Sequence, residues 1–312
     1  MSACWKLCEE TCTSAISRVS PREFAPGLSP IQEWECRIRL ENLVGYPARM
    51  AYLYFLAVFV GIPTLFFALL NATLRRLGIE FPSSLQAWPV LTVVGGHVLL
   101  ALVYTSPWDN YLVATRVWWY NPDLVLGFTL GYVPFEEYLF FVGQTVLLGL
   151  ALLVAGRLVP DPALSFRPRP SLRLGSAGLA LVAWLFGLLL LFRDHLPGTY
   201  MGLELVWGMI PILIQFTFGA DILWHHRRPV LWTLLPGTLY LAGADALAIR
   251  SGTWTIDPEQ SLGVILGGIL PLEEFVFFLL TSSMVVFGVT LVIAKESHVR
   301  ARWFSGRLRS FP

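Results

Sequence analysis

The sequence is poor in charge and in cysteine, and it lacks the short motifs of nucleotide and metal chemistry. Only 14% of the 312 residues are charged, against about a quarter in an average soluble domain. No GxGxxG, P-loop or HExxH pattern occurs, which argues against dinucleotide-binding enzymes, P-loop enzymes and zinc proteases of that kind. We therefore expect no cofactor, no metal and no nucleic-acid partner.

All four cysteines lie in the first 49 residues, a segment unlike the rest of the chain. Cys4, Cys8 and Cys12 have helical spacing that a soft metal could use, but no His or CxxC pair supports such a site. The segment has six acidic residues and no apolar signal-peptide core. We expect residues 1–49 to be a disordered extension or a mis-assigned start, with Met50 as a natural beginning.

What the chain has in abundance is apolar sequence. It is 55% hydrophobic, with a mean hydropathy of +0.63 and 12 Trp. A helix needs about 20 apolar residues to cross a bilayer, and seven stretches reach or approach this length. They are Met50 to Leu70, Trp88 to Thr105, Leu124 to Arg157, Ser176 to Phe192, Met201 to Ile222, Pro229 to Ile249 and Ser261 to Ala294. The pattern predicts an all-α, polytopic integral membrane protein whose partner is the lipid bilayer.

Two of these stretches are too long for one untilted span. Each contains a proline about ten residues in, Pro134 or Pro271. Proline is favoured in the first turn of a helix and disfavoured in its interior. We therefore expect a short interfacial segment in each stretch, followed by a helix that begins at the proline.

The basic residues predict the orientation of the chain. With seven spans, the loops on the C-terminal side carry thirteen Lys and Arg, against three in the loops on the opposite side. The positive-inside rule places the basic side in the cytoplasm. The sequence thus predicts a multi-pass protein of the cell membrane with its C-terminus inside and its N-terminus outside.

An internal repeat organises the chain. The segment "WDNYLVATRVWWYNPD" from Trp108 aligns with "ADALAIRSGTWTIDPE" from Ala244, and "PFEEYLFF" from Pro134 aligns with "PLEEFVFF" from Pro271. A weaker likeness joins "GIPTL" from Gly61 to "MIPIL" from Met209. We predict two parallel three-helix repeats, residues 50–157 and 200–295, a linker with one helix at 158–199, and a basic tail at 296–312. Parallel repeats are related by an axis along the membrane normal, so the duplicated acidic motifs should meet near it.

The repeated pair of glutamates has two interpretations. Acidic residues behind a proline are typical of a helix start, where they offset the helix dipole. Adjacent helical residues project about 100° apart, however, so this role explains one glutamate of each pair more easily than both. The second glutamate must face protein, water or lipid, and a charge in lipid is costly.

Aromatic residues gather at the same level as the glutamates. Burial and a neighbouring carboxylate raise the pKa of a glutamate and suit it to general acid catalysis, while aromatic faces stabilise a cation. The combination favours protonation of an alkene and guidance of the resulting carbocation. The candidate substrate-binding residues are Trp118, Trp119, Tyr138, Phe140, Phe141, Trp254, Phe277 and Phe278.

The two PxEE motifs, "PWDNYLVA" from Pro107, "DALAIRSGTW" from Asp245 and the three-one-three order of helices resemble the membrane lycopene β-cyclases of the heterodimer type, with both halves in one chain. The resemblance covers about Met50 to Lys295. It implies a redox-neutral closure of β-ionone rings on lycopene, giving γ-carotene and β-carotene, without a cofactor. It also implies catalytic roles for the motif glutamates and, as partners, for two aspartates. The candidates are Glu136, Glu137, Glu273, Glu274, Asp109 and Asp245, with Glu136 and Glu273 preferred as the acids.

Two other functions fit parts of the pattern. A carotenoid hydratase would use the same cation and capture water. A seven-helix transporter with parallel repeats would share the helix order, but it predicts polar groups near the middle of the bilayer, whereas these acids gather at one level. Glu204, opposite Leu56 in the repeat, is a hypothetical source of asymmetry between the halves. His225 to Arg228 is interpreted as a charged cytoplasmic turn.

Overall fold

The computed structural model describes residues 52–159, 165–192 and 196–308, with side chains as far as Arg302. The predictions for residues 1–49, including those for Cys4, Cys8 and Cys12, lie outside the described residues.

The described residues contain seven helices that are long and apolar enough to cross a membrane. The predicted all-α, multi-pass class is therefore confirmed. The first span combines α3 (Tyr52–Leu56), the π-helical turn η1 (Ala57–Gly61) and α4 (Ile62–Arg76), and the fifth combines η3 (Leu196–Gly198) with α8 (Thr199–His225). The others are α5 (Val90–Ala114), α6 (Phe135–Leu158), α7 (Pro170–Phe192), α9 (Arg227–Ser251) and α10 (Leu272–Ile293).

Both long apolar stretches break at their prolines, as predicted. Pro134 is the N-cap of α6 and Pro271 is the N-cap of α10. The residues ahead of each helix form a small hairpin, β2 (Thr129–Leu130) with β3 (Val133–Pro134) and β5 (Ile265–Leu266) with β6 (Leu270–Pro271). Each motif helix therefore starts from a structured loop.

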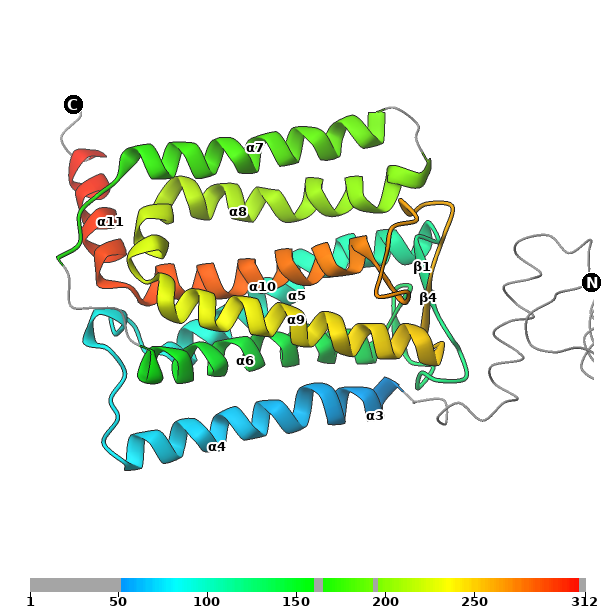
Figure 1. Ribbon diagram of the computed structural model, residues 1–312, viewed down its shortest axis with the longest axis horizontal. Coiled ribbons are helices and arrows are strands. Elements are labelled where there is room, and N and C mark those ends of the chain that lie inside the picture. The colour runs from blue at the N-terminus through cyan, green and yellow to red at the C-terminus, as the bar shows by residue number, and fades with distance from the viewer. Residues whose placement is uncertain (1–51, 160–164, 193–195, 309–312) are drawn as a thin grey trace, which may run out of the picture. The chain divides into compact units, whose positions relative to one another are not determined.

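The two motif helices lie in the centre of the bundle. Among the seven spans, α6 and α10 have the largest buried fractions, and α7 packs on α8 at one edge while α3 and α4 form the opposite edge (Figure 1). Helix α6 packs against α9, and α10 packs against α5. Each motif helix thus contacts the middle helix of the other predicted repeat.

Two contacts join positions that the sequence repeat makes equivalent. Gln144 Nε2 in α6 donates to Thr281 Oγ1 in α10 at 2.8 Å. Strand β1 (Trp118–Tyr120) pairs antiparallel with β4 (Trp254–Ile256), with Trp119 opposite Thr255 at the centre of the register. Equivalent residues meet each other only at a two-fold axis. The parallel arrangement of repeats remains a prediction, and these contacts support it.

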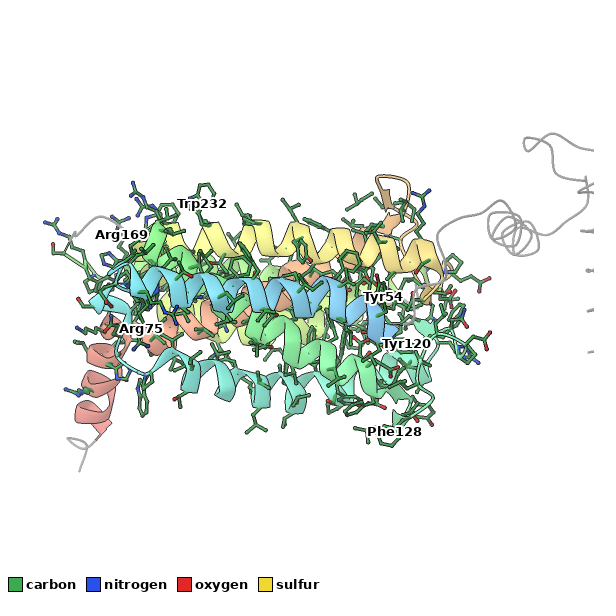
Figure 2. All side chains as sticks on the ribbon, turned by 90° about the horizontal axis from the view of Figure 1, so that it is seen from below. Tyr54, Arg75, Tyr120, Phe128, Arg169 and Trp232 are labelled. Carbon is green, nitrogen blue, oxygen red and sulfur yellow. The ribbon has the colours of Figure 1, made fainter. Side chains whose placement is uncertain are left out.

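The bundle has a basic end and an acidic, aromatic end. Figure 2 places Arg75 and Arg169 at the end opposite Tyr120. At the basic end α11 (Lys295–Leu308) crosses the helix termini (Figure 1), near the short turn η2 (Ser83–Leu85). Both terminal guanidinium nitrogens of Arg300 in α11 donate to the buried carboxylate of Asp221 in α8, at 2.7 and 2.8 Å. This bidentate pair fastens α11 to the bundle.

Candidate active site

A cavity lies at the end of the bundle away from α11, between the two central helices and the β1–β4 pair. Most of its lining residues are aromatic or acidic, and the rest are aliphatic. The lining residues are Tyr52, Phe55, Phe59, Val60, Trp108, Asp109, Trp118, Tyr120, Glu137, Phe140, Phe141, Tyr200, Leu241, Ala244, Asp245, Trp254, Ile256, Glu274, Phe277 and Phe278.

Four carboxyl groups from both halves of the chain share this single cavity. Asp109 and Asp245 come from the middle helices α5 and α9, and Glu137 and Glu274 come from the first turns of α6 and α10. No Lys, Arg or His is among the lining residues. Four like charges without a cation cannot stay ionised in an apolar site, so the group must retain protons. The duplicated acids therefore form one cluster of carboxyl groups that is at least partly protonated.

The two glutamates of each motif have different environments. Glu136 and Glu273 are fully buried and do not line the cavity. Their Oε1 atoms accept the backbone N–H of Leu126 and Leu262, each at 2.6 Å. These contacts tie each motif helix to the loop that precedes it. The first glutamate of each pair has the geometry of a structural brace, and the second faces the cavity.

Glu137 is held by two tyrosine hydroxyls. Tyr52 donates to its Oε2 at 2.5 Å and Tyr120 donates to the same oxygen at 3.1 Å. Burial, together with the nearby carboxyl groups of Asp109 and Glu137, raises the pKa of Tyr120 well above its ordinary value, so its hydroxyl keeps its proton. Both donors engage Oε2, which leaves Oε1 of Glu137 available to the cavity.

Glu274 has a related but different set of partners. Tyr200 donates to its Oε1 at 2.8 Å, and the carboxyl group of Asp245 lines the cavity with it. The indole Nε1 of Trp254 donates to Asp245 Oδ1 at 3.0 Å and orients it. Glu204 is fully buried one turn after Tyr200 and near Glu274, outside the cavity lining.

Six of the eight aromatic candidates line the cavity, namely Trp118, Phe140, Phe141, Trp254, Phe277 and Phe278. Trp119 and Tyr138 do not. Trp119 lies in β1 at the centre of the strand pairing. The hydroxyl of Tyr138 donates to the backbone oxygen of Leu130 at 2.8 Å, so it fixes the hairpin ahead of α6.

Several lining residues were not predicted, chiefly Tyr52, Tyr120, Tyr200, Phe59 and Trp108. A signal for the first and third was present. The offset that joins "GIPTL" to "MIPIL" also places Tyr52 opposite Tyr200 further upstream, and each of these tyrosines donates to the cavity-facing glutamate of its half. Extending the repeat in that direction would have identified them.

The cavity is small. It encloses about 50 Å³, room for a few water molecules rather than for the end of a long hydrocarbon. The rings that line it must therefore move when a large apolar substrate binds. With a substrate end inside it, the site would combine carboxyl groups that can act as acids and bases with aromatic faces that stabilise a cation.

A second polar cluster lies at the basic end. His226 Nε2 lies 3.2 Å from Glu296 Oε2, and His225 Nε2 lies 3.9 Å from Glu296 Oε1. Burial alone would raise the pKa of Glu296, but the hydrogen bond and charge of His226 outweigh it and the pKa is lowered. These three side chains, whose ligand atoms lie within 4.8 Å of one another, link the α8–α9 turn to α11. They are far from the cavity.

Comparison with known proteins shows which family the chain matches. Residues 52–155 and 197–292 match the lycopene cyclase family. The chain is 37% identical over 254 residues to a lycopene beta-cyclase of Halobacterium salinarum, covering 81% of this chain and 98% of that protein.

Fungal relatives match over a smaller share of their own length. A bifunctional lycopene cyclase/phytoene synthase of Aspergillus oryzae is 36% identical over 217 residues, which cover 67% of this chain and 36% of that protein. Its counterpart in Leptosphaeria maculans is 37% identical over 215 residues, covering 64% and 36%. No solved structure shows a significant match. Because one family accounts for more than half of its length, the chain belongs to the lycopene cyclase family.

Proposed function

We propose that the protein is a carotenoid cyclase that acts on lycopene and other linear carotenoids and closes β-ionone rings at their ends. The observation that carries the proposal is the single cavity in which duplicated carboxyl groups face one another between aromatic walls. A polyene is soluble in the bilayer, and it needs only a proton donor, a proton acceptor and a dry, cation-stabilising surface to cyclise.

The reaction is an isomerisation. A carboxylic acid adds a proton to the terminal double bond and leaves a tertiary cation. The neighbouring double bond attacks this cation, so the ring bond forms and the positive charge moves onto the ring. A carboxylate then removes a ring proton and the ring double bond forms. One proton enters and one leaves, so no oxidant or reductant is needed.

We assign the acid role to Glu137 and Glu274. Both line the cavity and receive tyrosine hydroxyls that fix the carboxyl group. The sequence preference for Glu136 and Glu273 remains a prediction, but their hydrogen bonds to the preceding loops favour a bracing role. Asp109 and Asp245 line the same cavity, which supports a role for them in returning a proton to the acids or accepting one from the ring.

The proposed organisation follows from the same features. Two parallel repeats, residues 50–157 and 200–295, would be joined by the segment 158–199 and related by an axis through the Gln144–Thr281 contact. The basic end with α11 would face the cytoplasm of the cell membrane, which puts the acidic cavity near the outer face. A topology map with single-cysteine labelling tests this orientation.

Expression in bacteria that accumulate lycopene tests the function. We expect extracted pigments to contain γ-carotene or β-carotene, identified by chromatography and mass. A hydroxylated product would identify a hydratase, and unchanged lycopene despite verified insertion into the membrane would refute the proposal.

A further inference from the structure

The two sides of the cavity differ in one pair of repeat-equivalent residues. Trp108 in α5 lines one side, and its equivalent on the other side is Ala244 in α9. One side of the cavity therefore carries a bicyclic indole ring at the position where the other side carries only a methyl group. The tyrosine that precedes each of these residues by one turn makes the same contact on both sides. Tyr104 donates to the backbone oxygen of Trp207 and Tyr240 donates to that of Phe59, each at 2.9 Å.

The Trp108 side is closed by stacked rings. The indoles of Trp108 and Trp207 stack with centroids 4.2 Å apart, Tyr104 stacks on Trp207 at 5.7 Å, and Phe277 lies parallel to Trp108 at 5.9 Å. The indole nitrogen of Trp108 also donates to the backbone oxygen of Leu203 in α8 at 3.3 Å. Each stacked pair adds about 0.5–1.5 kcal/mol beyond its buried area. This side is a fixed wall between α5 and α8.

The Ala244 side has no stacked indoles among its described residues, and Phe55 there meets Trp254 edge-on, with centroids 5.5 Å apart. Leu241 and Ala244 of α9 line the cavity with Phe55, Phe59 and Val60 of the first span. Phe59 takes the position of Trp207, and its ring contact with an aromatic neighbour is a tilted one with Phe55, 5.0 Å between centroids. It is partly exposed to the bilayer-facing surface while it lines the cavity. It also lies in the π-helical turn η1, a local irregularity of a kind often found at functional sites.

We infer that the linear end of the hydrocarbon enters the cavity sideways from the bilayer, between η1 and α9, passing Phe59 above Ala244. The inference rests on the proposed cyclase function. The occupant is an apolar isoprenoid chain, because the five lining residues named above for this side are all aliphatic or aromatic. Movement of the Phe59 ring enlarges the cavity, whereas the Trp108 stack stays in place.

The entrance is tested by moving the tryptophan from one side of the cavity to the other. In membranes containing the full chain, initial rates of lycopene consumption are measured for Ala244→Trp, for Trp108→Ala and for the double variant. We expect Ala244→Trp to lower the rate at least tenfold, because the indole fills the entrance. The double variant should regain at least a third of the original rate, because removal of the stack opens the opposite side.

Graded variants and a matched control protect the test against misfolding. Ala244→Val, →Leu and →Phe should lower the rate in order of size, while thermal unfolding shows that each is folded. Leu239→Trp places the same indole on the exposed face of α9, where 64% of Leu239 is accessible, and should leave the rate unchanged. A folded Ala244→Phe variant with at least half the original rate would overturn the inference. Failure of the unmodified chain to cyclise lycopene would instead refute the proposed function.

Discussion

Glutamine substitutions of the two glutamates in one motif separate the proton donor from the brace. In Glu137→Gln the amide oxygen can still accept the hydroxyls of Tyr52 and Tyr120 at 2.5 and 3.1 Å, so the fold is preserved and the acidic proton is lost. Loss of a general acid lowers a rate by about 10²–10⁴, or about 3–5 kcal/mol in activation free energy. We expect a decrease of this size in ring formation.

Glu136→Gln is the matched control. Its amide oxygen can still accept the N–H of Leu126, which lies 2.6 Å from the native carboxyl oxygen. The change replaces a carboxyl acceptor with an amide oxygen in a buried hydrogen bond, so the expected cost is about 1 kcal/mol of stability, with turnover within about threefold of the original. Both variants are assayed for product in lycopene-containing membranes and for thermal unfolding in detergent. Near-normal turnover in Glu137→Gln, or a hundredfold loss confined to Glu136→Gln, would refute the assignment.

Three further predictions concern the contacts around the site and at the basic end. Tyr52→Phe removes the hydroxyl that donates to Glu137 at 2.5 Å and leaves the hydrogen bond from Tyr120. Turnover should fall about tenfold. An unchanged rate would show that the Tyr52 hydroxyl does not contribute to catalysis. Arg300→Ala leaves the buried Asp221 with only Arg173 as a charged partner among the described residues, 3.9 Å away. It should lower the free energy of unfolding by about 3 kcal/mol. A melting temperature within a degree of the original would contradict this. The folded-state pKa of Glu296 lies below its ordinary value of 4.5, so its link to His226 contributes stability above that value and loses it as the pH falls through the lowered pKa. Hydrogen exchange in α11 should therefore quicken as the pH is lowered below that ordinary value, after correction for intrinsic rates, and Glu296→Gln should remove the step.

The sequence predicted the location of the cavity better than its detailed contacts. Hydropathy predicted the spans because bilayer thickness restricts helix length. The repeat predicted a meeting of duplicated acids, since equivalent residues of parallel repeats approach one another at the axis. Pro134 and Pro271 predicted where the motif helices begin because their rings fit a helix start and disrupt its interior.

The roles within each glutamate pair depend on tertiary structure. Neighbouring helical residues point about 100° apart, so which one faces the cavity is determined by the rotation of the helix about its axis. That rotation depends on packing with other helices and on the preceding loops, which offer the N–H groups of Leu126 and Leu262. The tyrosines Tyr52 and Tyr200 come from helices that only the weaker likeness of "GIPTL" to "MIPIL" relates to each other.

The central claim is that protein carboxyl groups, in equilibrium with solvent, protonate the polyene. Cyclisation in membranes suspended in D₂O, followed by mass spectrometry of the carotenoids, measures this transfer directly. The account predicts one deuterium for each ring closed, no label in unreacted lycopene, and loss of labelled product in Glu137→Gln/Glu274→Gln. Rings formed without deuterium would contradict it, because ring closure would then begin without a proton from these acids.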